Sequence, residues 1–367
     1  MKKIALLTCG RSDYSIYLPL IKALQTSDEF ELTVIAFGSH TSRYHGYSID
    51  AIHDHENLNL ISVDATLGDD KPASIASAMA LTTMKFAQIW ECNKFDLVVC
   101  LGDRYEMFAA VASTVPFNLK VAHFHGGEKT LGAFDNVFRH SITAMSHLHF
   151  VTCEMHAERV RQIIEDEGSD FVHNVGSLAL ENLNTIELMT KQDFKYKFDI
   201  DMDKPTILFT YHPETVDLSA NGRNVANLIS TFEDIDDQIL VTLPNNDTDG
   251  ARVRSALSAY AANKSNIFVY DFLGVQGYYS AMNHCSFMLG NSSSGIIEAA
   301  SFNKYVINVG DRQKGRHASA NVINIPCEKK YIQSAIKKIS KLSAYSGGNI
   351  YYKPDTIKLV IDIMRKI

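Results

Sequence analysis

Short hydrophobic runs alternate with longer amphipathic segments along the whole chain. Ten runs rich in Val, Ile, Leu and Phe are apolar on both faces, which predicts parallel strands that helices cover on both sides. The first half contains the runs 3–10, 30–38, 95–103, 119–127 and 147–154. The second half contains the runs 205–214, 238–247, 266–274, 285–294 and 305–313.

This pattern predicts two domains of similar size. A chain of 367 residues is too long for one small core, and each half has the strand and helix alternation of a doubly wound α/β domain. We place the seam near residues 171–184, which gives an N-terminal domain over 1–175 and a C-terminal domain over 176–350. The amphipathic segment 351–367 predicts a helix, and we expect it to pack back onto the first domain.

Composition and charge narrow the class of protein. The chain is 46% hydrophobic and 21% charged, as is typical of a soluble globular protein, and its net charge is −7. This charge argues against a general nucleic-acid binder or membrane-surface binder. No apolar run is long enough to span a bilayer, and we interpret residues 1–14 as a first strand rather than a signal peptide.

The six cysteines indicate a reducing compartment. None forms a Cys-x-x-Cys pair and several lie in apolar runs, so we expect reduced thiols and a cytoplasmic protein. Although the chain has 14 histidines, no Cys/His pair has the spacing of zinc ligands. We therefore expect no metal.

Polar residues follow the predicted strands in both halves. In open parallel sheets, ligands bind beyond the carboxyl ends of the strands. Seven such ends carry polar sequences, and together they predict one ligand cleft between two domains: CGRSDYS, LGDRYE, HFHGGEK, YHPE, LPNND, LGNSSSG and VGDRQKGR.

The stretch GNSSSG at 290–295 is a strand-to-helix turn of small residues. Backbone N–H groups and hydroxyls at such a turn suit a phosphate, and Glu298 lies where it can reach sugar hydroxyls. An ordinary serine N-cap is the alternative, and we expect Ser294 to be a cap or a spacer. The turn lacks both the G-x-G-x-x-G pattern and the P-loop lysine, so neither a nicotinamide cofactor nor ATP is favoured.

Basic, acidic and histidine side chains at the strand ends supply further candidates. Four arginines can pair with a diphosphate, or with surface carboxylates: Arg11, Arg104, Arg312 and Arg316. The candidates for proton transfer are Asp103, His123, His125, Glu128 and His212. Asp135 and Arg139 are four residues apart on one helix face, where a simple ion pair is the alternative.

In order along the chain, these motifs resemble the hydrolysing UDP-N-acetylglucosamine 2-epimerase family. The resemblance runs from TCGRSDYSIYLPLI through LGDRYE, HGGEKTLGAFDNVFRHSITAMSHLHF, YHPE, LPNND and GNSSSGIIEAASF to INVGDRQKGR. It implies two Rossmann-like domains facing across a cleft, as in GT-B-type glycosyltransferases. It also implies a UDP-amino-sugar substrate, no cofactor, and a homodimer or homotetramer.

The resemblance implies roles for individual residues. It assigns UDP binding to Arg11, Ser15, Arg104, His212, Asn245, Ser292, Ser293, Glu298 and Arg312. The serines would meet the diphosphate and Glu298 the ribose. It places the catalytic set around the sugar: Asp103, His125, Glu128, Asp135, Arg139 and His212. Many relatives have an acid where this chain has His125, so the catalytic role passes to His125 or Glu128, or is lost.

The implied reaction releases free ManNAc from UDP-GlcNAc, through a glycal, for sialic-type acid synthesis. The same reaction on UDP-2,4-diacetamido-2,4,6-trideoxyglucose, towards legionaminic acid, is the first alternative. A GT-B glycosyltransferase, a non-hydrolysing epimerase and a nucleotide-sugar sensor are the others. Release of UDP without an acceptor separates hydrolysis from all three.

Overall fold

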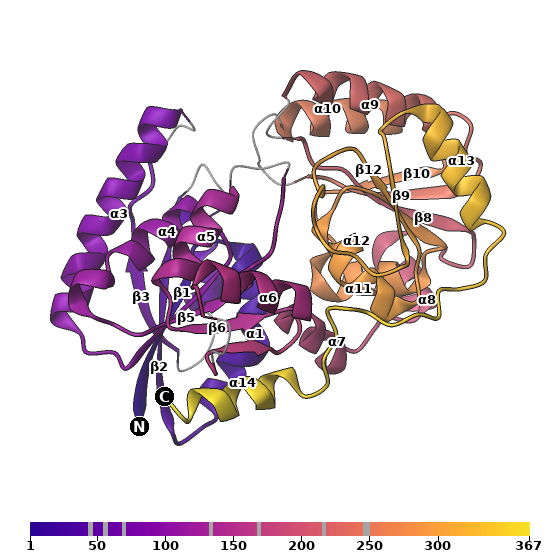
Figure 1. Cartoon of the computed structure of the whole chain (residues 1–367). Helices are drawn as coiled ribbons and strands as arrows, with labels where there is room; N and C mark the ends of the chain where they lie inside the picture. Colours follow the sequence, from indigo (N-terminus) through magenta and orange to yellow (C-terminus); the bar gives the residue numbers. More distant parts are fainter. Residues whose placement is uncertain are drawn as a thin grey trace. The chain divides into compact units, whose positions relative to one another are not determined.

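The computed structural model describes residues 1–42, 47–53, 58–67, 71–131, 135–166, 170–214, 218–244 and 250–367. The chain forms two compact units (Figure 1). Unit 1 contains Met1–Glu128, Phe134–Asn182 and Tyr351–Ile367. Unit 2 contains Lys129–Ala133 and Leu183–Ile350. The C-terminal segment therefore belongs to the unit that contains the N-terminus, and the main division follows Asn182.

Unit 1 is built on a parallel sheet of seven described strands in the order β3-β2-β1-β4-β5-β6-β7. The strands are β1 Lys2–Thr8, β2 Phe30–Phe37, β3 Asn59–Val63, β4 Leu97–Leu101, β5 Val121–Phe124, β6 Leu148–Val151 and β7 Val172–Asn174. The chain order reverses between β1 and β4, and such a switch point is where ligands bind in open α/β sheets.

The helices of unit 1 alternate with its strands. They are α1 Arg11–Gln25, α2 Ile49–His53, α3 Pro72–Cys92, α4 Tyr105–Ala112, α5 Asp135–Met145, α6 Glu154–Ile163 and α14 Thr356–Met364. Short 3₁₀ turns accompany them in the described part of the unit: η1 Gly38–His40, η2 Val115–Phe117 and η3 Leu178–Glu181. Helix α7, Asn182–Thr185, begins at the last residue of the second segment of unit 1.

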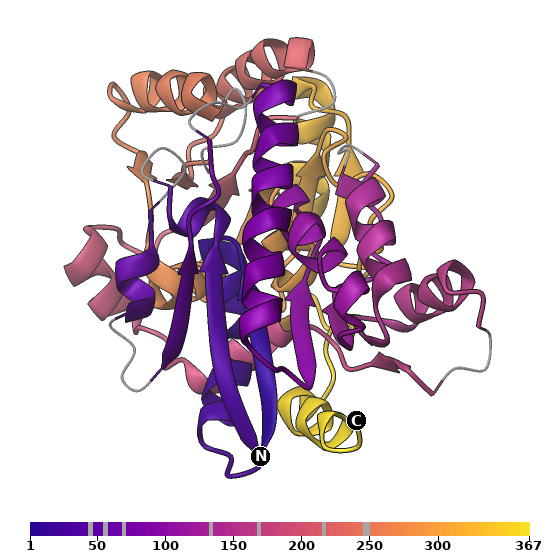
Figure 2. The same cartoon turned by 90° about the vertical axis from the view of Figure 1, so that its left-hand side faces the viewer.

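Alternate residues of β1 enter two different hydrophobic cores. Ile4 and Leu6 pack with α1 and α14 on one face of the sheet. Ala5 and Leu7 pack with α3, α4 and α5 on the other face, and Figure 2 shows α3 lying in front of the strands. Burial on both faces is the physical reason why these strands are continuously apolar rather than alternating.

Unit 2 contains a parallel sheet of six described strands in the order β10-β9-β8-β11-β12-β13. The strands are β8 Thr206–Thr210, β9 Gln238–Thr242, β10 Ile267–Tyr270, β11 Phe287–Gly290, β12 Val306–Val309 and β13 Val322–Ile325. The chain order reverses between β8 and β11, which are distant in sequence and neighbours in the sheet. This sheet therefore has a switch point of its own.

The helices of unit 2 cover both faces of its sheet. They are α8 Lys191–Phe198, α9 Leu218–Phe232, α10 Gly250–Ala261, α11 Gly274–His284, α12 Ser293–Ile297 and α13 Lys329–Ile339, with the 3₁₀ turn η4 Ala299–Phe302. Ile207 and Phe209 of β8 pack with α9, α10 and α13. Leu208 packs on the opposite face with α8 and α11, and Figure 1 shows the two sets of helices on either side of the strands.

The expected fold class, two doubly wound α/β domains, is confirmed. All ten predicted strands are present, and the structure adds β3, β7 and β13, which the sequence pattern missed. These three strands lie at the edges of the sheets, and most of their residues are only partly buried. Partial burial weakens their hydrophobic signal, although β10, which also lies at an edge, was predicted. Within the described ranges, no helix is both long and apolar enough to cross a membrane.

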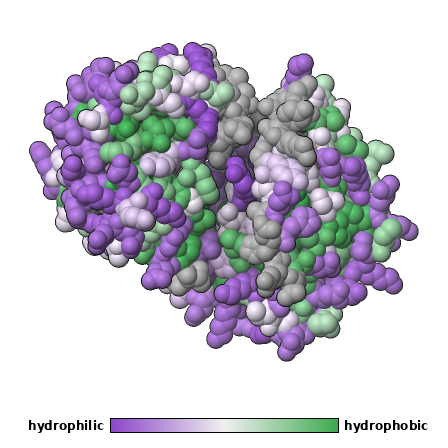
Figure 3. All heavy atoms as spheres, turned by 180° about the vertical axis from the view of Figure 1, so that it is seen from behind, coloured by the Kyte–Doolittle hydropathy of each residue, from purple (hydrophilic) through white to green (hydrophobic). Residues whose placement is uncertain are grey.

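The visible surface agrees with the overall composition. Figure 3 shows hydrophilic residues interspersed with hydrophobic ones on both units. Single exposed apolar side chains such as Met84, Phe272 and Tyr196 are ordinary features of a folded surface.

Candidate functional site

The predicted residues of unit 1 gather at the carboxyl ends of β1, β4 and β5. Strand β1 pairs with β4, and β4 pairs with β5. Arg11 and Ser15 lie in the first turns of α1, Asp103 and Arg104 lie between β4 and α4, and His125 directly follows β5. Sequence positions far apart are therefore brought to the switch-point edge of one sheet, as expected for a ligand site.

Arg139 and Asp103 form an ion pair that joins α5 to the end of β4. Arg139 is 3% exposed, so its guanidinium is held by the protein rather than by solvent. Asp135, the other carboxylate that the sequence offers for this arginine, is the first residue of α5. The structure gives Arg139 a carboxylate from another element, which places that carboxylate beside a fixed positive charge.

His125 and Glu128 form a second pair, which is buried. His125 Nδ1 lies 2.9 Å from Glu128 Oε1, and both side chains are almost fully buried. His125 has a φ of +65°, a left-handed conformation that is uncommon for residues other than glycine. The orientation of the His125 side chain therefore depends on this left-handed turn.

The second glycine in HFHGGE explains how this turn fits against α6. A Cβ on Gly127 would overlap the carbonyl oxygen of His156. Arg159 of the same helix donates from Nη1 to the Gly127 carbonyl at 2.8 Å. The close backbone approach requires glycine at 127, and α6 in return fixes the turn that carries Glu128.

The arginines of unit 1 differ in their surroundings. Arg11 is exposed, and within the described ranges its side chain has no ion-pair partner. Arg104 donates to Glu106 from both Nε and Nη2, so its charge is already paired in this structure. Of the two, Arg11 is the better placed to receive an anionic ligand.

Two buried polar residues hold the strand ends of unit 1 in place. Asp13, which sequence reasoning missed, accepts from the Cys9 N–H at 2.8 Å and holds the turn between β1 and α1. His123, a candidate for proton transfer, lies 2.9 Å through Nε2 from the Gly102 carbonyl and ties β5 to the end of β4. Burial lowers the pKa of His123 to about 3, so this ring is neutral. Polar residues inside or just after apolar runs were the only signal for such roles.

In unit 2, His212 and Asn291 join the ends of β8 and β11. The His212 N–H donates to Asn291 Oδ1 at 2.7 Å, and Asn291 Nδ2 donates to the His212 carbonyl at 2.8 Å. His212 is 8% exposed, and burial, followed by the charge of Arg312, lowers its pKa to about 3. A neutral imidazole is therefore fixed at the switch point of this sheet.

Sequence reasoning undervalued Asn291. Its side chain is fully buried, and its backbone carbonyl accepts from Arg312 Nη1 at 3.2 Å and from Gln313 Nε2 at 2.9 Å. It thereby links the segments that follow β8, β11 and β12. An asparagine directly after a buried strand is the signal that could have identified it.

The three serines have different surroundings. Ser292 is the N-cap of α12, and its hydroxyl accepts from the Ser294 N–H. The Ser294 hydroxyl is hydrogen-bonded to the Tyr278 hydroxyl and lies 3.0 Å from that of Ser292. Ser292, rather than Ser294, is thus the cap. The Ser293 hydroxyl has no hydrogen-bond partner among the residues that the structure describes, so it is available to a ligand.

Glu298 lies at the end of the short helix α12. Helix α12 has only five residues, and Glu298 is both its C-cap and the residue before η4. The Tyr279 hydroxyl donates to Glu298 Oε1 at 3.3 Å, and burial raises the pKa of Glu298 to about 8. Such a short helix contributes little dipole to a phosphate site, so the hydroxyls and N–H groups matter more.

The remaining predicted residues of unit 2 follow its strands β9 and β12. Arg312 lies just after β12 and is partly buried, with its guanidinium held near the end of β11 by the Asn291 carbonyl. Arg316 is also partly buried, and its N–H donates to the Gln313 carbonyl at 3.1 Å. Asn245 lies outside the described residues, so its predicted contact with UDP has no structural account.

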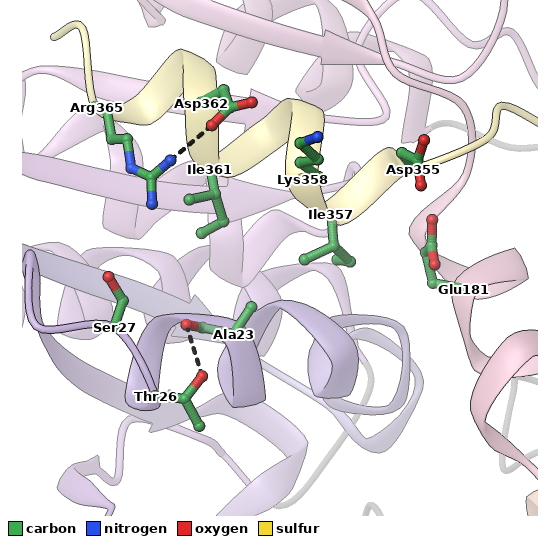
Figure 4. Close-up of a pocket in the computed structure, with 10 residues that line it drawn as sticks. All are labelled: Ala23, Thr26, Ser27, Glu181, Asp355, Ile357, Lys358, Ile361, Asp362 and Arg365. Carbon is green, nitrogen blue, oxygen red and sulfur yellow. Dashed lines mark hydrogen bonds and ion pairs between the residues drawn. The ribbon is translucent and has the colours of Figure 1, made fainter.

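A separate hollow in unit 1 lies at the other end of α1. A cavity of about 660 Å³ opens between α1 and α14, where Figure 4 shows Ile357 and Ile361 pointing towards the α1 residues Ala23 and Thr26. Arg365 in its lining is paired with Asp362. Because Arg11 begins α1 and Ala23 lies near its end, about 18 Å away along the helix axis, this hollow is distinct from the predicted site.

Comparison with known proteins adds a family match. The family model described as UDP-N-acetylglucosamine 2-epimerase matches residues 22–365. A relative from Campylobacter jejuni, GDP/UDP-N,N'-diacetylbacillosamine 2-epimerase (hydrolyzing), is 34% identical over 88% of this chain and 84% of its own. Polysialic acid biosynthesis protein P7 from Escherichia coli is 32% identical over 100% of this chain and 94% of its own.

A solved structure shows the same fold. The UDP-GlcNAc 2-epimerase from Neisseria meningitidis bound to UDP-GlcNAc has a TM-score of 0.81, with 100% of both chains covered. Its sequence identity is 18%, so this likeness supports the fold alone.

Proposed function

The chain belongs to the UDP-N-acetylglucosamine 2-epimerase family, and from this premise we propose that it is a hydrolysing epimerase of a UDP-linked 2-acetamido sugar. It releases UDP and inverts C2, which gives a free 2-acetamido sugar of the manno series. Such a product suits the synthesis of sialic-type acids.

The acid and base groups that unit 1 gathers at one sheet edge carry this proposal. The Asp103–Arg139 and His125–Glu128 pairs supply carboxylates and an imidazole at one sheet edge. Binding a sugar does not require two such pairs, whereas proton transfer at C2 requires both a base and an acid. The word "hydrolyzing" in the name of the Campylobacter relative supports release of UDP.

The proposed reaction has two steps. In the first, the C1–O bond breaks, UDP leaves with the bonding electrons, and a base removes the C2 proton to give a glycal. In the second, water adds at C1 and a proton is delivered to the other face of C2. Arg11, Arg312 and the Ser293 hydroxyl are proposed to stabilise the leaving diphosphate, because fixed donors act strongly on developing charge.

Other residues have proposed supporting roles. Ser15, Arg104, Asn245, Ser292 and Glu298 complete the UDP-binding set, with Glu298 near the ribose. Asp135 and His212 complete the catalytic set. The neutral His212 is suited to donate or accept a hydrogen bond at the glycosidic phosphate.

Two sugars are candidates for the substrate. UDP-GlcNAc follows from the family, and a diacetamido-trideoxy sugar follows from the name of the Campylobacter relative. The Escherichia coli relative is named for polysialic acid, which favours the first. We propose UDP-GlcNAc as the substrate, with UDP-2,4-diacetamido-2,4,6-trideoxyglucose as the alternative.

Incubation in deuterated water tests the proposal. With the correct substrate, NMR is expected to show free UDP and a free sugar with inverted C2 that carries deuterium at that carbon. The ratio of kcat/KM for the two candidates identifies the sugar. If neither sugar yields UDP and deuterated product, the proposal is wrong. UDP release that requires a second sugar as acceptor would instead indicate a glycosyltransferase.

Replacing Ser293 with alanine is expected to weaken UDP binding by about 10- to 100-fold, because one hydrogen bond to a charged phosphate is worth about 1.5–3 kcal/mol. The melting temperature should change little, since this hydroxyl has no partner among the described residues. Calorimetric titration with UDP and thermal unfolding measure the two effects.

The neighbouring Ser294→Ala variant is the matched control. It removes the hydrogen bond to the Tyr278 hydroxyl, so it should lower thermal stability more than Ser293→Ala does. Equal loss of stability and UDP binding in Ser293→Ala would show that Ser293 only supports the turn.

We also propose that the enzyme works in the cytoplasm. All six cysteines are free thiols and five of them are buried, as expected in a reducing compartment. The homodimer or homotetramer that the family resemblance implies stays a prediction, which analytical ultracentrifugation of the purified protein tests.

A further inference from the structure

A line of buried side chains in unit 1 runs from the turn after β5 into α6. His125 Nδ1 lies 2.9 Å from Glu128 Oε1. The Thr152 hydroxyl donates to the same Glu128 oxygen at 3.4 Å, and it also lies 2.8 Å from His156 Nδ1. All four residues are less than 9% exposed. Neither Thr152 nor His156 belongs to the proposed catalytic set.

The donors and acceptors in this line fix its direction. A carboxylate only accepts hydrogen bonds, so Thr152 gives the single proton of its hydroxyl to Glu128. His156 then donates from Nδ1 to the Thr152 oxygen. The same carboxylate oxygen of Glu128 also accepts the Nδ1–H of His125.

This arrangement leaves the second ring nitrogen of His125 as the reactive one. In a neutral imidazole with hydrogen on Nδ1, the lone pair lies on Nε2. His125 Nε2 is buried and has no hydrogen-bond partner in the described part of the chain. The left-handed backbone at His125 holds the ring in this position at a cost in strain, and such strain persists at functional sites.

We propose that His125 Nε2 is the base that removes the C2 proton, that Glu128 is a positioning residue that fixes the tautomer of His125, and that Thr152 is a positioning residue that orients Glu128. This rests on the proposed function. The C2–H electron pair becomes the C1=C2 bond, UDP leaves with the C1–O pair, and the proton moves to Nε2. The Glu128 carboxylate stabilises the imidazolium that forms.

The first experiment removes the ring without disturbing the turn. Glycine tolerates the positive φ at 125, so His125→Gly is the variant that the backbone favours. It is expected to lower kcat/KM about 1,000-fold, and added imidazole should restore activity at least about tenfold. Imidazole should not restore the activity of Glu128→Gln. If His125→Gly is folded and imidazole does not restore its activity, His125 is not the base.

The second experiment reads the tautomer directly. In ¹⁵N-labelled protein, the NMR signals of the His125 ring, identified by their loss in His125→Gly, should show hydrogen on Nδ1. Thr152→Val should lower kcat about tenfold, because it removes the hydrogen bond that orients Glu128, while Thr152→Ser, which keeps the hydroxyl, should keep the wild-type kcat. Thr114→Val is the control, because its buried hydroxyl donates to the Val111 carbonyl and takes no part in this line.

The outcomes separate this inference from the proposed function. If wild-type protein turns over neither sugar, the proposed function fails, and the base assignment fails with it. If wild-type protein is active while His125→Gly retains its rate, only the base assignment is wrong. A His125 ring with hydrogen on Nε2 would also overturn it, whatever the activity.

Discussion

Replacing Asn291 with alanine is expected to lower the free energy of unfolding by about 2–4 kcal/mol and to abolish turnover. The change removes both side-chain hydrogen bonds to the His212 backbone. It takes these partners from a buried N–H and a buried carbonyl, and each such loss costs about 1–3 kcal/mol. His212 is then no longer held at the switch point. Chemical denaturation and the UDP-release assay measure the two losses.

Asn308→Ala is the matched control for this prediction. Asn308 is 3% exposed and lies on the same sheet, where it donates a side-chain hydrogen bond to Asn324. Asn308→Ala should lower the free energy of unfolding by about 1 kcal/mol and leave kcat close to that of the wild type. If Asn291→Ala and Asn308→Ala have the same free energy of unfolding and the same kcat, the Asn291 hydrogen bonds to the His212 backbone do not support catalysis.

Acidification is expected to unfold the protein between pH 6.5 and about pH 4. Burial lowers the pKa of His123 and His212 to about 3, and that of His149 to about 4. These groups bind a proton more readily when unfolded, so they stabilise the fold above pH 6.5, and this stability is lost as the pH falls towards their folded pKa values. At pH 4.5 the three histidines together would lower the free energy of unfolding by on the order of 8 kcal/mol.

Glu298 acts in the opposite direction. Burial raises its pKa to about 8, so its stabilising contribution is complete below its unfolded pKa and declines as the pH rises towards 8. One carboxyl does not offset three histidines below about pH 5. We therefore expect maximal stability close to about pH 6.5, measured as the free energy of unfolding across about pH 4–8.

His149→Gln provides the control for the acid prediction. His149 is buried and lies outside the proposed catalytic set, and glutamine does not titrate. The variant should lose less stability between about pH 6.5 and pH 4.5 than the wild type does. An unchanged slope in the variant would show that His149 does not contribute to acid unfolding.

Much of the candidate site was predictable because parallel sheets place ligands at strand ends. The run ending in YHPE and the run ending in GNSSSG each carried polar residues after a buried strand. The roles that sequence reasoning missed, such as those of Asn291 and Thr152, depend on hydrogen bonds to distant segments. No spacing in the chain indicates such bonds.

The sequence by itself determined the two α/β units, ten of their strands and the family of the chain, because periodicity and ordered motifs are local properties. Only the tertiary structure decided that Arg139 pairs with Asp103, that Ser292 rather than Ser294 caps α12, and that Glu128 holds His125. The Arg139–Asp103 pair joins two separate elements, so it depends on strand order, which is set by packing across the whole sheet. The His125–Glu128 pair depends on the left-handed turn at His125, which Arg159 of α6 holds through the Gly127 carbonyl. The choice of cap depends on where packing against the sheet lets α12 begin.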